Sequence, residues 1–151
     1  MYTEIEKKAE FYGATIVDFD FPSSIRYAYY NGVIAINKKI VDDADRRCII
    51  ALGLGRHLMG NNNSIALSEE VSNVVALHWA VSNLMPFNAL IEAKKLGLDS
   101  VNEVAEYLRV TPDFFETGIE FYKNTYGSRI FHHDCIIDLE KNIVEPLKEV
   151  G

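Results

Sequence analysis

The chain has 151 residues, 48% of them hydrophobic and 25% charged, which is the composition of a globular protein long enough to bury a core. Its net charge of −7 argues against non-specific binding to nucleic acid or anionic membranes and favours a protein partner or a small ligand. No apolar run approaches the roughly 18 residues of a membrane span. The charged N-terminus is unlike a signal peptide, and two cysteines without a Cys-x-x-Cys pair make no disulfide framework, so we expect a cytoplasmic protein.

The beginning of the chain predicts one helix and a small antiparallel sheet. Apolar residues recur on one face of segment 2–12, as in an amphipathic helix. Residues 14–21 alternate as in a strand. The Asn31–Gly32 pair joins segments 25–30 and 33–38, which is the pattern of a tight antiparallel hairpin.

Most of the remaining chain predicts helices. Aspartates at the start of segment 42–59 favour a helix N-terminus there, and a second long helix is expected over about 65–85. Shorter helices follow, one opened by the capping box at Ser100 and one by Thr111 before a proline, and then a short β tail. This order predicts an α+β fold in which a small antiparallel sheet packs on a helical body.

One face of the second long helix is apolar, and we expect most of it to lie in the core. Its residues recur at helical spacing. They are Val71, Val74, Val75, His78, Trp79, Ser82 and Met85.

Four stretches carry a resemblance to a known family. They are "GVIAINKKI", "ALGLGRHLMG" in place of a variant of "AHELGHHLLG", "ALHWAVSNLMP" against segments like "ADEFAAYLLMP", and "EVAEYLRVTPDFFETGIEFYKNTYG". In this order and spacing the chain resembles the ImmA/IrrE metallopeptidase domain, especially its short prophage-encoded members. The resemblance implies such a domain over residues 1–127, with residues 128–151 as a strand-rich tail packed on it.

In that family a zincin-like pair of core helices builds a zinc site, from His-Glu-x-x-His on the first helix and an acidic third ligand on the second. Carried over to this chain, the two histidines fall on Leu52 and Arg56, the general base on Gly53 and the third ligand on Val75. None of these residues can bind zinc or accept a proton. The resemblance therefore implies a pseudoenzyme without a cofactor, in which Leu52 and Val75 bury each other. Gly55 stands where a neighbouring element is expected to approach closely.

A zinc-dependent endopeptidase with shifted ligands is the alternative, and zinc is expected only in that case. His57, His78 and one of Glu69 or Glu70 would then hold the metal. No acid has the right spacing to serve as the base. The simpler interpretation places His57 at the C-terminal end of its helix, where a cation is favoured, and makes His78 a half-buried structural residue.

The segment His132–Cys135 gathers residue types that can bind metals. Neighbouring residues on a strand point to opposite faces, so neither face would have the ligand count of a structural zinc site. We therefore favour a surface strand with Cys135 pointing inward.

A DNA-binding regulator is the second alternative. The helices expected over 101–108 and 112–127 have helix-turn-helix spacing. Asp113, Glu116 and Glu120 stand where a DNA-reading helix needs basic or amide side chains, which makes direct nucleic-acid binding unfavourable.

The hairpin offers the first choice for a partner surface. Arg26, Tyr27, Tyr29 and Tyr30 lie on or beside its first strand, and both residue types are enriched at binding hot spots. Cross-strand packing of the tyrosines is the structural alternative. Active members of the family relieve phage and mobile-element repressors by cleaving them. A member without the site is expected to bind such a repressor, or another host or phage regulator, as an antirepressor-like protein.

Overall fold

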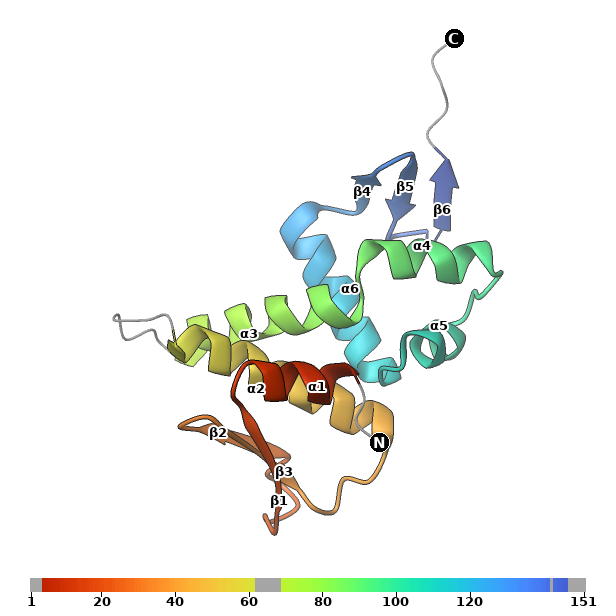
Figure 1. Cartoon of the computed structure of the whole chain (residues 1–151). Helices are drawn as coiled ribbons and strands as arrows, with labels where there is room; N and C mark the ends of the chain where they lie inside the picture. The colour runs from red at the N-terminus through yellow and green to blue at the C-terminus, as the bar shows by residue number, and fades with distance from the viewer. Residues whose placement is uncertain (1–3, 62–68, 142, 147–151) are drawn as a thin grey trace. The chain divides into compact units, whose positions relative to one another are not determined.

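The computed structural model describes residues 4–61, 69–141 and 143–146 (Figure 1). This part of the chain contains six helices and six strands. It divides into two compact units between Leu84 and Met85. The α+β class predicted from the sequence is confirmed, whereas the boundary expected after residue 127 stays a prediction.

The first unit is a three-stranded sheet covered on one face by helices. Helix α2 packs against β2 and β3, and α1 packs against β1 and α2. The elements of the unit are α1 (Glu4–Phe11), β1 (Thr15–Phe19), β2 (Tyr27–Tyr30), β3 (Val33–Asn37), α2 (Asp43–Asn61) and α3 (Glu69–Leu84).

The sheet is mixed rather than entirely antiparallel. Strands β2 and β3 form the predicted hairpin, and its turn residues Asn31 and Gly32 both have positive φ, as a tight turn requires. The hairpin places β3 in the centre, in the order β1-β3-β2. Because the chain reverses its direction twice between β1 and β3, these two strands are parallel. Central position explains why Ile34 and Ile36 are completely buried.

Helix α2 begins as the aspartates predict. The carboxylate of Asp42 accepts the backbone N–H of Asp45 at 2.9 Å, which satisfies one of the free donors of the first turn. Arg46 donates to the carbonyl oxygen of Ile40 at 3.4 Å and to the carboxylate of Asp18 at 2.7 Å, so the loop and β1 are both tied to this helix.

Helix α3 turns a different face inward from the one predicted. Val71, Val74 and Val75 are 46%, 58% and 42% exposed, whereas Ala76 and Ala80 are buried. The expectation that most of the valine-containing face lies in the core is therefore wrong. The alanine face lies inward because α2 approaches it closely, and only small side chains fit there. The helix was expected from about residue 65, and residues 65–68 lie outside the described part of the chain.

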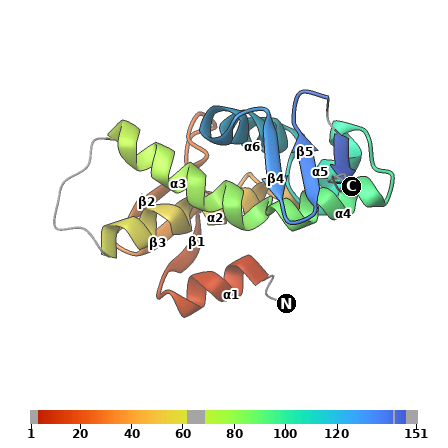
Figure 2. The same cartoon turned by 90° about the horizontal axis from the view of Figure 1, so that it is seen from above.

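The second unit combines three helices with an antiparallel sheet in the order β4-β5-β6. Seen from above in Figure 2, these strands lie beside the helices, with α4 packed against β6 and α6 against β4. The elements are α4 (Phe87–Lys95), α5 (Val101–Leu108), α6 (Pro112–Tyr126), β4 (Arg129–His132), β5 (Cys135–Asp138) and β6 (Ile143–Pro146). The expected β tail is thus a three-stranded sheet, and residues 147–151 of the tail lie outside the description.

Both predicted helix caps of this unit are present. The Ser100 side chain accepts the backbone N–H of Glu103 at 3.1 Å, and its hydroxyl donates back to the Glu103 carboxylate at 2.9 Å. Thr111 accepts the backbone N–H of Phe114 at 3.0 Å, with a proline at the first helical position. Such caps stabilise a helix by about 1 kcal/mol each.

In the described part of the chain, no single helix is long and apolar enough to cross a membrane, although the consecutive helices α3 and α4 meet the length and composition criteria when taken as a pair.

Candidate functional site

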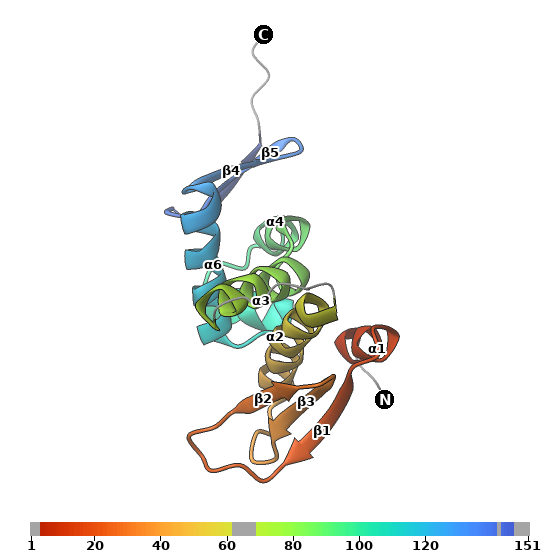
Figure 3. The same ribbon diagram turned by 90° about the vertical axis from the view of Figure 1, so that its left-hand side faces the viewer.

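The positions that the resemblance assigns to a zinc site lie on α2 and α3, which pack together on the helical side of the first sheet (Figure 3). Gly53 faces the sheet, where an added Cβ would lie 2.8 Å from side-chain atoms of Ile34. Gly55 faces α3, where an added Cβ would lie 2.8 Å from backbone atoms of Ala76. The close approach expected at Gly55 is therefore confirmed. Both glycines are explained by packing on two sides of one helix.

The general-base position has no room for a side chain. Real Cβ contacts are essentially never as short as 2.8 Å, and Ile34 is completely buried in the central strand. A buried β-branched side chain has few alternative rotamers and cannot move aside cheaply. A carboxylate at position 53 would therefore require β3 or Ile34 to change.

The other three positions are not buried together: Leu52 and Arg56 are half-buried and Val75 is exposed. Leu52 is half-buried, and Val75 remains 42% exposed, so the expected burial of Val75 against Leu52 is wrong. The Arg56 guanidinium donates to the side-chain oxygen of Asn73 and so links α2 to α3. Where the family mechanism needs converging ligands, this chain has an arginine–asparagine bridge beside valines.

His57 belongs to a buried hydrogen-bond network. Its Nε2 lies 2.7 Å from the carbonyl oxygen of Tyr12, which can only accept, so Nε2 carries the proton. In the neutral ring Nδ1 therefore accepts from the Tyr29 hydroxyl, which lies 2.7 Å away. The same hydroxyl oxygen accepts the backbone N–H of Gly32 at 3.1 Å. The network ties α2 to the hairpin and to the chain that follows α1.

The shifted zinc site is not assembled in the described residues. No group of three or more His, Cys, Asp or Glu side chains that could hold a metal ion is found among them. His57 already has a protein partner at each ring nitrogen. His78 and Glu70 are exposed, and the side chain of Glu69 lies outside the description.

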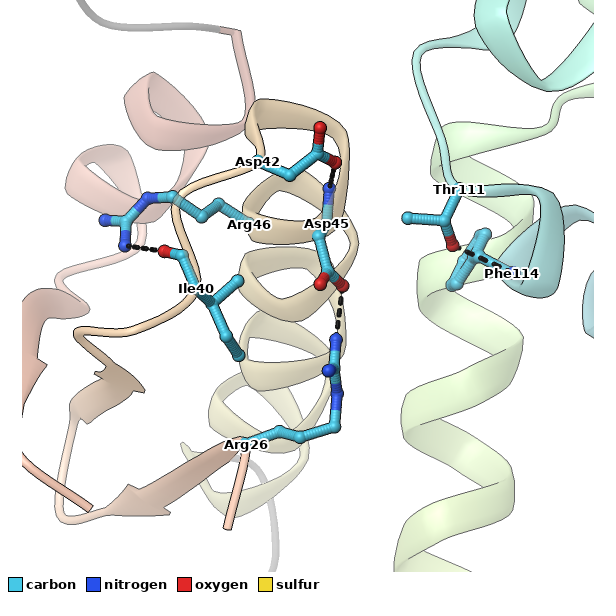
Figure 4. A network of polar contacts seen from close by, with 7 residues as sticks. All are labelled: Arg26, Ile40, Asp42, Asp45, Arg46, Thr111 and Phe114. Atoms are coloured by element: carbon cyan, nitrogen blue, oxygen red, sulfur yellow. Dashed lines mark hydrogen bonds and ion pairs between the residues drawn. The ribbon is translucent and has the colours of Figure 1, made fainter. Parts of the chain in front are cut away.

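The four residues of the hairpin surface do not share one face. Tyr27 and Tyr29 are half-buried on the side that faces α2, whereas Tyr30 is 81% exposed on the opposite side. Arg26 forms an ion pair with Asp45 at the start of α2 (Figure 4). As a partner surface these residues stay a prediction, and Tyr29 has the structural role described above.

An exposed apolar surface on α3 was not predicted from the sequence. Val71, Val74 and Val75 follow one another at helical spacing on the exposed side of α3, and we call them the valine face. Contiguous exposed apolar side chains on a helix are typical of interaction sites. The signal was visible as a periodic pattern, but periodicity does not tell which apolar face of a helix lies inward.

The segment His132–Cys135 is a hairpin turn rather than a continuous strand. His133 has a positive φ, and the chain reverses between β4 and β5, which pair in register from His132 and Cys135 onward. Cys135 is buried, as expected, and its thiol donates to the Asp134 carboxylate at 3.5 Å. His132 lies within hydrogen-bond distance of the Asn88 side-chain oxygen, at 2.9 Å.

The Cys135 thiol is not set up as a nucleophile. Its burial raises its pKa, the neighbouring Asp134 raises the pKa further, and only Lys95 acts in the opposite direction. The thiolate is the reactive form, so this cysteine stays protonated and unreactive at neutral pH.

The acidic face of α6 is exposed as the sequence indicates. Asp113, Glu116 and Glu120 are exposed, while Phe114 and Phe115 are buried. An acidic helix face repels phosphate groups, so the arrangement gives no support to a DNA-reading helix.

Comparison of the chain with protein-family models, with curated proteins and with solved structures found no match. The resemblance to the ImmA/IrrE domain therefore rests on the sequence motifs alone.

Proposed function

We propose that this chain is a non-catalytic, ImmA/IrrE-like protein of a phage or mobile element. It acts in the cytoplasm by binding a regulatory protein, such as a phage-type repressor. The observation that carries the non-catalytic part is the contact between position 53 and Ile34, which leaves no space for a general base. Leu52 has no ligand atom and Arg56 stays protonated, so neither of these positions can hold a metal ion that would activate a water molecule.

The valine face supports binding as the mode of action. Three β-branched side chains lie about half-exposed on a single helix face, beside the Arg56–Asn73 bridge. Covering them would contribute roughly 1 kcal/mol per valine, because about half of each side chain still remains to be buried. Their fixed rotamers in a helix also lower the entropic cost of binding.

The test uses two matched valine variants. Val74→Glu places a charge in the valine face, and Val41→Glu makes the same change at a residue that is 81% exposed and lies outside it. Tagged wild-type protein and both variants are incubated with lysate of the host carrying the intact prophage. We expect wild type and Val41→Glu to retain the same regulatory protein and Val74→Glu to lose it.

Two results would contradict the proposal. Retention by Val74→Glu equal to that of Val41→Glu would show that the valine face is not the binding surface. Stoichiometric zinc in protein purified without chelator, together with loss of that zinc in His57→Ala or His78→Ala, would favour the shifted-ligand endopeptidase instead.

A further inference from the structure

A groove in the second unit has the chemistry of an anion site. It has a volume of about 300 Å³ and lies between the C-terminal turn of α4 and the strands β5 and β6. This volume is at the lower end of the range for small-molecule sites. The lining residues are Lys94, Lys95, Asp134, Cys135 and Val144.

Lys94 occupies a position where an apolar residue is expected. It follows Leu90 by one helical turn, and both residues line a small cavity of about 20 Å³ together with apolar side chains of α5, α6 and the sheet. Lysine ordinarily extends its ammonium group to water. Here the Nζ atom is buried and makes no hydrogen bond to any residue that the structure describes. A buried charge without a partner is strongly unfavourable.

The carboxylates of Asp138 and Asp134 each accept a hydrogen bond from another group. Asp138 lines the small cavity, but its Oδ1 accepts the backbone N–H groups of Glu140 and Lys141 at 3.1 and 3.0 Å. Asp134 accepts the Cys135 thiol. The residues that line the groove therefore include two lysines and one aspartate. The helix dipole favours cations at the end of α4, which explains basic residues there but not the burial of one ammonium group.

We propose that the groove binds a small anion through a carboxylate or phosphate group that accepts hydrogen bonds from Lys94 Nζ. The anion would supply the hydrogen-bond acceptor that the described residues do not provide. Lys95, on the same groove, would add a second positive charge. Val144 offers an apolar contact for the rest of the ligand, so the class is a small organic acid or phosphate ester rather than a bare ion. This site is independent of the proposed protein-binding function.

The probes are inorganic phosphate and acetate, each titrated separately into isotope-labelled full chain at constant ionic strength set with chloride. Amide chemical shifts of Asp134, Cys135 and Val144 report on the groove. We expect saturable shifts at these residues in the wild type. Lys94→Met should weaken binding about tenfold or more, since one charge-assisted hydrogen bond is lost. Lys141→Met, at an exposed lysine outside the groove, should bind as the wild type does.

The two probes separate the possible ligand groups. A response to phosphate alone assigns a phosphate site, a response to acetate alone assigns a carboxylate site, and a response to both supports a site for either group. No saturable response to either probe, or equal binding by wild type and Lys94→Met, would overturn the proposal.

The thermal midpoint without either probe gives a second criterion. If the Lys94 ammonium is unpaired, Lys94→Met should unfold at a higher temperature than the wild type. A lower midpoint for Lys94→Met would show that Lys94 already has a counter-charge, for example Asp138 through a water molecule in the small cavity, and would also overturn the proposal.

Discussion

Gly53 is the residue at which packing most clearly determines which side chain the chain can carry. A helix interior disfavours glycine by about 1 kcal/mol relative to alanine, so its presence needs a structural reason. The reason is Ile34, which fills the space that a side chain at position 53 would need. The sequence motif located the position, but only the structure shows why no larger residue fits.

Gly53→Ala should lower the free energy of unfolding by about 1–3 kcal/mol, because overpacking against Ile34 outweighs the gain in helix propensity. Gly60→Ala is the matched control in the same helix, since an added Cβ there meets no atom of a described residue within 4 Å. That control should be neutral or stabilising by up to about 1 kcal/mol. Urea denaturation measures both, and equal midpoints for the two variants would refute the packing explanation.

The Tyr29 hydroxyl allows a second test at this scale. Tyr29→Phe leaves His57 Nδ1 and the Gly32 N–H without their partner, which should cost about 1–3 kcal/mol of stability. Tyr27→Phe is the control. Tyr27 is half-buried on β2, as Tyr29 is, but its hydroxyl makes no hydrogen bond to a described residue. A cost of Tyr27→Phe as large as that of Tyr29→Phe, in the same denaturation assay, would argue against the network.

Cys135 gives a pH-dependent expectation. Its pKa is raised in the folded state, so the folded protein holds the thiol proton more tightly than the unfolded chain. The resulting contribution to stability is complete below the unfolded-state pKa and is lost as the pH rises through the folded-state value. Cys135→Ser should therefore flatten the loss of stability in the alkaline range. An unchanged alkaline slope would contradict this assignment.

At the scale of elements, local signals in the sequence were sufficient for most helices and for the hairpin. Asn31–Gly32 and the caps at Ser100 and Thr111 act within a few residues, so their structural effect is visible in the sequence. The inward face of α3 depends on α2, a partner distant in sequence, and was predicted wrongly. The parallel pairing of β1 with β3 likewise depends on contacts between segments that are not adjacent in the sequence. The turn at His133 is local, but it lacks the Asn-Gly type of signal that marks the first hairpin.

Gly55→Ala tests the α2–α3 contact. The added Cβ would meet backbone atoms of Ala76, which cannot rotate away as a side chain can. The two helices would have to separate, so we expect a loss of about 2–3 kcal/mol, near the upper end for overpacking. Unfolding by urea with far-ultraviolet circular dichroism measures the loss, and a change below about 0.5 kcal/mol, the usual size of a surface substitution effect, would mean that the helices adjust freely.

At the scale of the whole molecule, charge limits the partners. The net charge of −7 and the acidic exposed face of α6 both disfavour nucleic acid. The site itself was only partly predictable. The resemblance indicated which positions to compare with a zinc site, whereas the exposed valine face and the buried Lys94 ammonium arise from tertiary packing that periodicity cannot report.

We therefore expect no binding to duplex DNA even at about 50 mM salt, where phosphate contacts are strongest. Fluorescence anisotropy with a labelled random duplex measures this, and a basic DNA-binding protein serves as the positive control. Binding that weakens steeply as salt is raised would instead support the DNA-binding regulator.

The contact between Gly53 and Ile34 also bears on how this chain can change over evolutionary time. If its ancestor was an active peptidase, restoring a glutamate at position 53 alone would unfold the helix–sheet contact before it restored any activity. Reversion would need a smaller residue at Ile34 and three new ligands in α2 and α3. No single one of these substitutions would restore activity. On that assumption, the packing at position 53 would make the loss of the active site difficult to reverse.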